Sequence, residues 1–438
     1  MRACPARRGG AAALLAALCP PRSFRRSDSV ASAGPTPVAA GHAHYGVSFG
    51  EFVALIAALM AVNALAIDVM LPALPQIGAS LAVADANGPQ AVIISYLFGL
   101  GGAQLIFGPL SDRYGRRPIL LAGLTLFVAA GLVAAFAQSF EQLLAARLAQ
   151  GVGAAAPRVI AISLARDCYG GRAMGRVMSL AMMVFMSVPI VAPSLGQIVL
   201  MFGSWRWVFG TLVIGGAALV AWTSLRLPET LPPQDRRSLS ARAVGSACRE
   251  VLTTRVTVGY MLAMSLTHGA LFGFVTSAQQ IFVDVFDTGR LFAVFFAMIA
   301  GTLGVAAFLN SRLVGRHGMR RLSHAATIAF IGISALHFLV ALGGLESLAV
   351  FMVMQSLTLL VFGFIAPNFN ALAMDPMGHI AGTASSVIGF FTTTAGAALG
   401  YFTGQAFDGS VLPFTLANLL WGAAALVVIF VTERGRLF

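Results

Sequence analysis

The chain has 438 residues, of which 58% are hydrophobic and only 10% are charged, and its formal net charge is +12. Soluble domains carry about 25% charged residues, so a water-soluble fold of this length could not bury so much apolar surface. All 28 cationic residues are arginines, scattered in short segments between apolar runs. That distribution argues against a nucleic-acid-binding face. The composition therefore indicates an integral membrane protein.

Twelve apolar segments approach the length of about 20 residues that a helix needs to cross a bilayer. In chain order, we expect spans near residues 50–72, 89–110, 118–137, 141–164, 175–200, 206–226, 256–281, 290–312, 322–342, 346–373, 380–406 and 411–432. The longest polar interval, 227–255, is rich in proline and arginine, which is typical of a linker. We interpret it as a cytoplasmic linker between an N-terminal six-helix bundle, 49–226, and a C-terminal one, 256–438. The predicted fold is all-α.

The arginines predict the orientation of these spans. With a cytoplasmic N-terminus, 24 of the 28 arginines fall in cytoplasmic segments and only Arg206 and Arg290 fall on the other face. This bias predicts that both termini are cytoplasmic. An apolar run from Ala11 to Cys19 is similar to a short signal peptide, but cleavage there would reverse the bias. We interpret residues 1–48 as a disordered cytoplasmic tail or a misassigned start.

An internal repeat supports the division into two halves. The segment Leu313–Arg321 is similar to Leu110–Pro118 at an offset of 203 residues, with Gly315 in place of Asp112. At an offset of 208 residues, Asp167 matches Asp375. Many transporters consist of such repeats, with the substrate site at the interface between them. We therefore expect a shared scaffold whose charged residues differ between the halves.

Charged residues inside a membrane are costly and are functional hypotheses by default. Asp68 lies near the outer end of the first span, where a carboxyl group could bind and release a proton; the alternative is a hydrated residue that caps the span. Arg147 and Arg158 lie three helical turns apart on one face of the fourth span, about 16 Å from each other. Arg147 is either functional or part of a structural ion pair. Arg158 either lines a wet cavity or reaches the cytoplasmic interface.

A second charged group lies at the predicted cytoplasmic ends of spans 2 to 4. It comprises Asp112, Arg113, Arg116, Arg117 and Asp167, with Gly108 and Gly115 in the same loop. An acidic group gains from the dipole at a helix N-terminus, so Asp112 could bind the start of span 11 and act as a gate. The alternative is anchoring by positive charge alone.

Two further features concern the span interiors. Pro189 and Pro193 each lack an amide donor on one face of span 5, and Gly196 allows a neighbouring helix to approach; an ordinary kink is the alternative. Several polar side chains could line a substrate cavity or could instead make hydrogen bonds between helices. They are Asn63, Gln104, Gln150, Arg158, His268, Gln279, Gln355 and Asn368.

No catalytic motif, P-loop or metal-ligand spacing appears in the sequence. We therefore predict that the protein is not an enzyme and has no cofactor or metal. A proton gradient would supply its energy.

These motifs resemble those of one family. The segment Gly108–Pro118 resembles the loop between spans 2 and 3 of the major facilitator superfamily. Ala66–Pro75, Ala192–Gly196, Trp205–Trp207, Leu227–Leu231 and Gly378–Ser385 resemble the Bcr/CflA group within it, from about residue 50 to the end.

The resemblance implies proton-coupled multidrug efflux across a bacterial inner membrane. It also implies that the protein is a monomer. It assigns proton coupling to Asp68 and Arg147, a cytoplasmic gate to the loop 2–3 group, and an antiporter-like kink to span 5. Some related exporters carry a second acid in span 1, whereas this chain has Leu59-Met60-Ala61 there. This difference favours neutral or zwitterionic substrates. The alternatives are a symporter that imports a small nutrient and a non-transporting membrane receptor.

Overall fold

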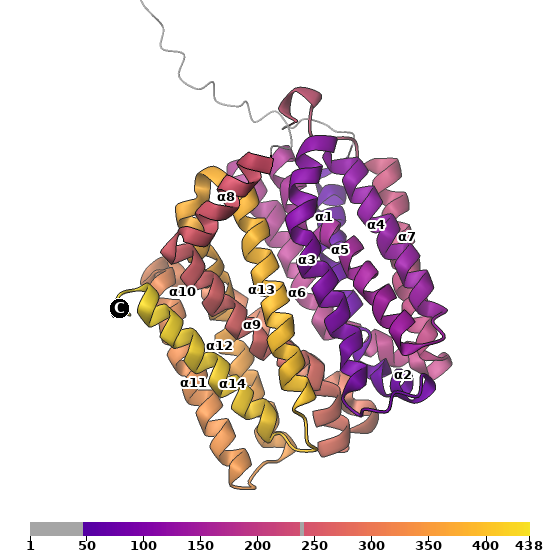
Figure 1. Ribbon diagram of the computed structural model, residues 1–438, viewed down its shortest axis with the longest axis vertical. Helices are drawn as coiled ribbons and strands as arrows, with labels where there is room; N and C mark the ends of the chain where they lie inside the picture. The colour runs from indigo at the N-terminus through magenta and orange to yellow at the C-terminus, as the bar shows by residue number, and fades with distance from the viewer. Residues whose placement is uncertain (1–46, 237–240) are drawn as a thin grey trace, which may run out of the picture. The chain divides into compact units, whose positions relative to one another are not determined.

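The computed structural model describes residues 47–236 and 241–438 (Figure 1). The predicted tail, 1–48, lies outside the described residues except for Val47 and Ser48. The long helices of the described chain are α1 Phe49–Asp68, α3 Ala91–Tyr114, α4 Arg116–Ala135, α5 Phe140–Cys168, α6 Gly171–Phe202, α7 Trp205–Arg226, α9 Arg255–Gln280, α10 Phe292–His317, α11 Met319–Leu342, α12 Leu348–Met374, α13 Ala381–Gln405 and α14 Leu412–Thr432. Two shorter helices are α2 Leu74–Ser80 and α8 Ala241–Thr253.

Eleven helical segments are long and apolar enough to cross a membrane, and the longest, Leu348–Gln405, contains both α12 and α13. Twelve helices are therefore available for crossing, as the sequence predicted. The interval interpreted as a linker, 227–255, contains the helix α8. The first predicted span, 50–72, extends beyond the regular part of α1, which ends at Asp68 and is followed by the 3₁₀ turn Leu71–Ala73.

Local chemistry explains where several helices begin and end. Ser48, Ser139 and Ser347 accept hydrogen bonds from backbone N–H groups at the starts of α1, α5 and α12, as N-cap residues do. Gly115 (φ +103°) separates α3 from α4, and Gly318 (φ +79°) separates α10 from α11. Both adopt a positive φ, which favours glycine. They lie 203 residues apart, so the sequence repeat is also a repeat of backbone geometry.

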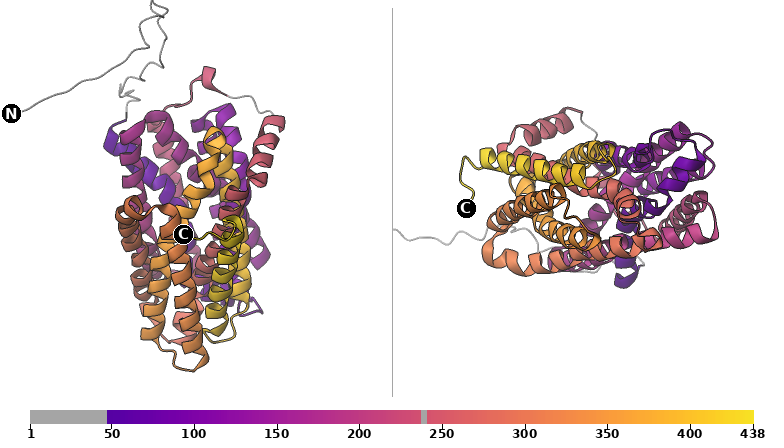
Figure 2. Two further views of the ribbon diagram at one scale, coloured as in Figure 1. Left: turned by 90° about the vertical axis from the view of Figure 1, so that its left-hand side faces the viewer. Right: turned by 90° about the horizontal axis from the view of Figure 1, so that it is seen from below.

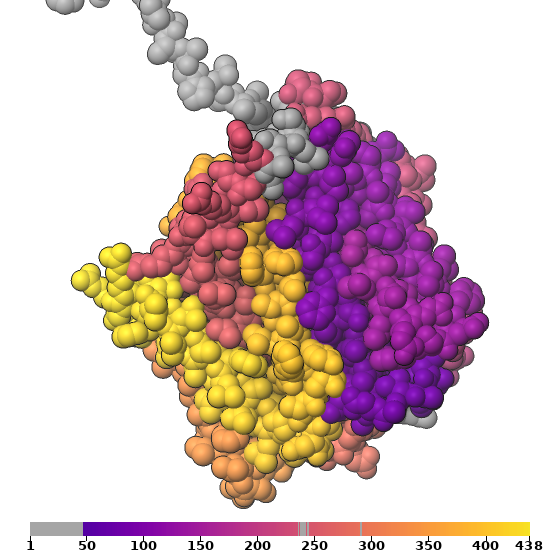
Figure 3. Space-filling model, viewed as in Figure 1, coloured from indigo at the N-terminus to yellow at the C-terminus, as the bar shows by residue number. Residues whose placement is uncertain are grey.

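Within the unit His42–Phe438, the two halves meet where α3 packs against α13 and where α6 packs against α10. Figure 3 shows the α3 surface directly against the α13 surface, and Figure 2 shows the same helices from two other sides. Large apolar side chains such as Phe202, Ile214, Leu339 and Val427 are exposed. Exposed apolar surface of this kind is expected where lipid is the solvent.

Candidate functional site

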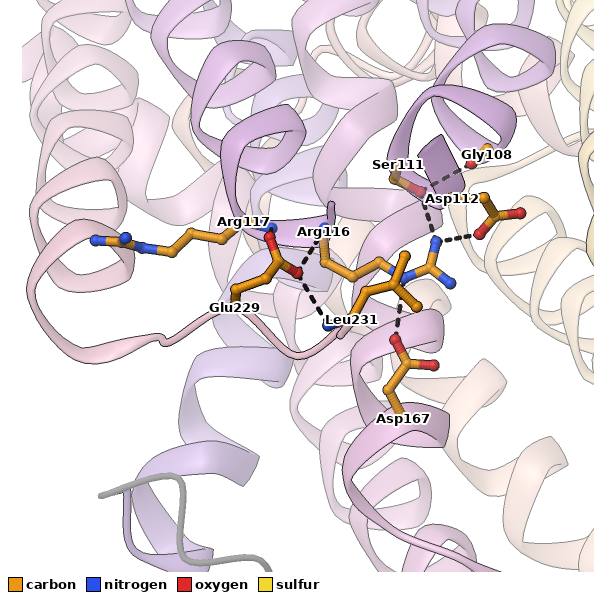
Figure 4. Close-up of polar contacts among 8 residues, drawn as sticks. All are labelled: Gly108, Ser111, Asp112, Arg116, Arg117, Asp167, Glu229 and Leu231. Carbon is orange, nitrogen blue, oxygen red and sulfur yellow. Dashed lines mark hydrogen bonds and ion pairs between the residues drawn. The ribbon is translucent and has the colours of Figure 1, made fainter. Parts of the chain in front are cut away.

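The guanidinium of Arg116 organises the polar loop between α3 and α4. Its Nε donates to Asp167 Oδ2 at 3.0 Å and its Nη1 donates to Ser111 Oγ at 2.7 Å, while Nη1 also bonds the Asp112 carboxylate (Figure 4). Arg116 is buried, whereas the Asp112 side chain is 38% exposed. Because all four residues belong to the N-terminal half, this network holds α3, α4 and α5 together at one end. We call that end the arginine-rich end.

Glu229 caps the start of α4 from beyond the end of α7. Its carboxylate accepts from the backbone N–H groups of Arg116 at 2.9 Å and Arg117 at 3.3 Å, and from Leu231 N–H at 3.0 Å (Figure 4). A carboxylate at a helix N-terminus pairs with otherwise unbonded N–H groups and with the positive end of the helix dipole. The sequence analysis grouped Glu229 only with a family motif and missed this contact. An acidic residue shortly after a sixth span is the signal that could have indicated it.

Gly115 has a second reason to be glycine besides its backbone conformation. A Cβ at this position would lie 2.3 Å from Glu229 Oε2. Gly108 also lies at a close approach, because its Cβ would lie 2.9 Å from Ser386 Oγ in α13. The predicted gate glycines thus have different neighbours: Gly115 faces the Glu229 cap, and Gly108 faces the other half of the protein.

The remaining members of the predicted gate lie near the same loop. Arg117 Nη2 donates to the Ser224 carbonyl at 2.6 Å, and the Arg113 guanidinium lies 5.2 Å from the ring centroid of Tyr114. Neither contact joins the two halves. In this conformation, the side-chain hydrogen bonds and ion pairs that Asp112, Arg116, Arg117 and Asp167 make with described residues all lie inside the N-terminal half.

Arg147 is fully buried, and its hydrogen bonds go to neutral acceptors. Nε donates to the Val92 carbonyl at 3.1 Å, Nη2 to the Ala66 carbonyl at 3.0 Å and Nη1 to Gln150 Oε1 at 2.7 Å. The guanidinium also lies 4.5 Å from the ring centroid of Tyr96. The Arg147 side chain therefore connects α5 to α1 and α3 through hydrogen bonds.

Asp68 is the last residue of α1 and is 5% exposed. Within the described ranges, its carboxylate has no hydrogen-bond or ion-pair partner. Arg147 reaches the Ala66 carbonyl, two residues earlier in the same helix. The two residues assigned to proton coupling are thus joined through the end of α1 and not by a direct ion pair.

The proline-containing helix α6 packs against the turn that follows Asp68. A Cβ at Gly196 would lie 2.2 Å from the Val69 carbonyl oxygen and 2.9 Å from Pro72 Cγ. α6 remains helical through Pro189 and Pro193. Gly196 therefore permits a close approach of α6 to the residue next to Asp68.

The polar residues predicted to line a cavity have different surroundings. Asn63 Oδ1 accepts from Tyr96 Oη at 3.2 Å, Gln104 Nε2 donates to Thr393 Oγ1 at 3.2 Å, and Asn368 Nδ2 donates to Asn310 Oδ1 at 2.7 Å. Of these bonds, only that of Gln104 joins the two halves.

The other members of this group make fewer side-chain bonds. Gln355 is buried, and its Oε1 has no partner among the described residues. The Nδ1 atom of His268 lies 2.9 Å from the Met264 carbonyl oxygen. Arg158 is exposed and bonds to none of the described residues. Gln279 lines a cavity of about 380 Å³ at the end of the helices opposite the arginine-rich end.

At that opposite end, amide groups join the two halves. Asn87 Nδ2 donates to the carbonyls of Gln405 and Phe407 at 3.1 and 3.0 Å, and Gln405 Nε2 donates back to the Asn87 carbonyl at 2.9 Å. Gln280 Nε2 donates to Asn87 Oδ1 at 2.7 Å, and Gln280 Oε1 accepts a hydrogen bond from Gln90 Nε2. The sequence analysis missed Asn87, Gln90 and Gln405, because polar residues near a loop carry no distinctive pattern.

Comparisons with known proteins agree with this architecture. The Major Facilitator Superfamily model matches residues 56–401. The chain is 32% identical over 343 residues to the MFS-type transporter YdgK of Bacillus subtilis, covering 76% of this chain and 84% of YdgK. It is 30% identical over 330 residues to a bicyclomycin resistance protein homolog of Haemophilus influenzae, covering 74% and 81% of the two chains.

A third relative is the multidrug resistance protein MdtL of Shigella dysenteriae, 28% identical over 327 residues, with coverage of 74% of this chain and 80% of MdtL. Among solved structures, the xylose transporter XylE from E. coli, in a partially occluded inward open conformation, aligns with a TM-score of 0.68 at 12% identity. That alignment covers 86% of this chain and 97% of the XylE chain, and it supports the fold alone. This chain is a multi-pass membrane transporter, not an enzyme, and it belongs to the Major Facilitator Superfamily.

Proposed function

We propose that this transporter exports drug-like or small metabolite molecules across a bacterial inner membrane in exchange for protons. The names of two relatives, a bicyclomycin resistance protein homolog and a multidrug resistance protein, support export of drug-like compounds. The arginine bias of the sequence supports a cytoplasmic location for the arginine-rich end and for both termini. The exporter would work by alternating access, with its two bundles moving about a site between them.

The observation that carries this proposal is the unpaired carboxyl group of Asp68. An ionised carboxylate that is buried without a cation or hydrogen-bond donor is costly. A change in the exposure of Asp68 would therefore be accompanied by uptake or release of a proton. Gly196 allows α6 to contact the residue after Asp68, so movement of α6 would alter that exposure. Arg147 would hold the end of α1 in position through the Ala66 carbonyl.

The contacts between the halves support a gating role for the loop 2–3 group. In this conformation the amides of Asn87, Gln280 and Gln405 join the halves at the outer end. Gly108 already lies against Ser386 in the second turn of α13, and Ile380, the N-cap residue of α13, makes no side-chain cap hydrogen bond. When the outer contacts open, Asp112 would leave Arg116 and bind the start of α13.

Drug susceptibility in a pump-deficient bacterial host tests the proposal. Cells would express the wild type, Asp68→Asn or Glu141→Gln, a control that removes an exposed acidic group at the start of α5. We expect the wild type and Glu141→Gln to confer resistance to some compounds and Asp68→Asn to confer none at equal membrane expression.

Each other outcome has a definite meaning. Resistance that survives in Asp68→Asn would retain efflux but reject Asp68 as the coupling acid. Drug accumulation that rises on expression of the wild type would favour a symporter that imports its substrate. No change in resistance or accumulation for any compound would reject the proposed export of drugs.

A further inference from the structure

A cavity of about 380 Å³ lies between the two halves, at the end opposite the arginine-rich end. Its walls come from the start of α2 and the loop before α3 in the N-terminal half, and from the end of α9 and the loop after α13 in the C-terminal half. The helix α2 marks this end of the molecule in Figure 1. Ligand cavities in proteins have volumes of about 300–1,000 Å³, so this cavity can hold a small organic molecule.

A chain of amide groups along the cavity wall fixes which atoms donate hydrogen bonds. Asn87 Nδ2 must be a donor, because both of its partners are backbone carbonyls, at 3.1 and 3.0 Å. Asn87 Oδ1 is therefore an acceptor, and it receives a bond from Gln280 Nε2 at 2.7 Å. Gln280 Oε1 in turn accepts from Gln90 Nε2. All three amide nitrogens thus donate to acceptors of the protein, which makes this wall poorly suited to an anionic ligand.

The charged groups of the cavity are two aspartates, Asp284 and Asp408, and none of the described residues that line it is basic. Asp284 lies in the π-helical turn Ile281–Val285 that follows α9, and it forms no hydrogen bond or ion pair with a described residue. Single π-helical turns are rare and frequently mark functional sites. Asp408 Oδ1 accepts from the N–H and hydroxyl groups of Ser410 at 2.9 and 2.7 Å. Two carboxylates without a nearby cation favour a positively charged ligand.

Gln279 adds a buried polar group that the described part of the protein leaves unused. Its side chain is 6% exposed and lines the cavity, yet its amide forms no hydrogen bond with a described residue. The next residue, Gln280, differs because its amide bonds both Asn87 and Gln90. Buried amides without a partner are costly and uncommon. A ligand in the cavity would supply the missing hydrogen bond.

The remaining lining residues indicate an organic ligand. Among the described residues, no three His, Cys, Asp or Glu side chains come together in a way that could hold a metal ion. Leu74, Pro75 and Phe407 line the same cavity and give it an apolar part. An ammonium group forms charge-assisted hydrogen bonds with carboxylates, and the carbon skeleton that carries it gains free energy by leaving water.

We infer that this cavity binds an amine-bearing organic molecule, whose ammonium group lies at the carboxylates of Asp284 and Asp408 and whose polar atoms bond the Gln279 amide. This inference rests on the proposed transport function. It narrows the substrate class from neutral or zwitterionic molecules to those that carry an ammonium group, zwitterions included. Because the walls belong to both halves, separation of the halves at this end would open the cavity and release the molecule.

Equilibrium binding to the purified full-length protein, in nanodiscs of phosphatidylcholine, tests the inference without a proton gradient. The probes are three matched pairs, namely benzylamine with benzyl alcohol, phenethylamine with phenethyl alcohol, and tryptamine with tryptophol; empty nanodiscs are the blank. We expect the wild type to bind at least one amine about tenfold or more tightly than its alcohol, because the alcohol lacks the charge-assisted bonds. In the double variant Asp284→Asn/Asp408→Asn, that ratio should fall to about one.

Two further variants separate a lost contact from a general effect of charge or folding. Asp284→Glu retains the charge and should keep part of the preference for the amine. Asp287→Asn removes an exposed carboxylate that does not line the cavity and should keep most of the preference; asparagine tolerates the positive φ at that position. The inference would be overturned by a wild type without preference in any pair, by a preference that survives in the double variant, or by an equal loss in Asp287→Asn.

The binding measurement is independent of the efflux experiment. A protein that prefers amines through Asp284 and Asp408 but confers no resistance would overturn the proposed efflux and leave the inference standing. Resistance that depends on Asp68, combined with equal binding of amines and alcohols, would do the reverse.

Discussion

Glu229 and Glu433 follow the last helices of the two halves and perform related tasks 204 residues apart. Glu229 accepts the backbone N–H groups of Arg116 and Arg117 at the start of α4. Glu433 Oε2 lies 2.6 Å from Arg320 Nη2 at the start of α11. In each half, an acidic residue after the last spanning helix (α7 or α14) thus bonds the start of the third spanning helix (α4 or α11). The repeat preserves the connection while the N-terminal half uses backbone donors and the C-terminal half uses a side chain.

Glu229→Ala should destabilise the N-terminal half, because the first N–H groups of α4 lose their acceptor. Loss of a helix cap costs about 0.5–2 kcal/mol. We expect a lower thermal midpoint for the purified protein, measured by fluorescence-detected size exclusion after heating. Arg249→Ala, at an exposed position within α8, is the control. Equal midpoints for Glu229→Ala and the wild type would contradict the capping role.

Gly115→Ala should be more destabilising than an ordinary glycine substitution. The new Cβ would adopt a positive φ and would lie 2.3 Å from Glu229 Oε2. Strain of this kind costs about 1–3 kcal/mol. Gly102→Ala is the matched control, since a Cβ there has no neighbour within 4 Å and alanine favours a helix. The same thermal assay should place Gly115→Ala below the wild type and Gly102→Ala at or above it.

Arg147→Lys should impair both stability and transport even though the charge is retained. A lysine ammonium cannot reproduce the planar set of bonds to Val92, Ala66 and Gln150, and a buried acceptor left without a donor costs about 1–3 kcal/mol. The readouts are thermal stability and accumulation of a fluorescent substrate in cells. Arg312→Lys, near the end of α10, should behave as the wild type. Unchanged behaviour of Arg147→Lys would show that charge alone suffices.

A covalent link between residues 87 and 405 should arrest transport. The Asn87 and Gln405 side chains bond each other's backbone across the interface between the halves, at the end opposite the arginine-rich end. Cysteines at both positions should therefore cross-link in a background without the native cysteines. We expect transport to stop on oxidation and to return on reduction. Each single-cysteine variant serves as a control. Normal transport by the cross-linked protein would mean that this contact does not open during the cycle.

Several features of the fold could be predicted from the sequence because they depend on short-range patterns. Twelve apolar segments predicted the twelve long helices of the described chain. The repeated loop predicted the equivalent turns at Gly115 and Gly318. The acid at position 229 was visible as part of a motif, but its contact with α4 was not. That contact joins residues more than 100 positions apart.

The sequence by itself determined that the chain lies in a membrane, since its apolar segments can be satisfied only by lipid or by one another. It also determined which few residues carry charge inside the spans. The tertiary structure decided what each of those charges meets. Arg147 and Arg158 share a helix face in the sequence, yet one is enclosed by carbonyl groups and the other is free. The physical reason is that the cost of a buried charge depends on the polar groups that surround it, and those groups come from helices distant in the chain.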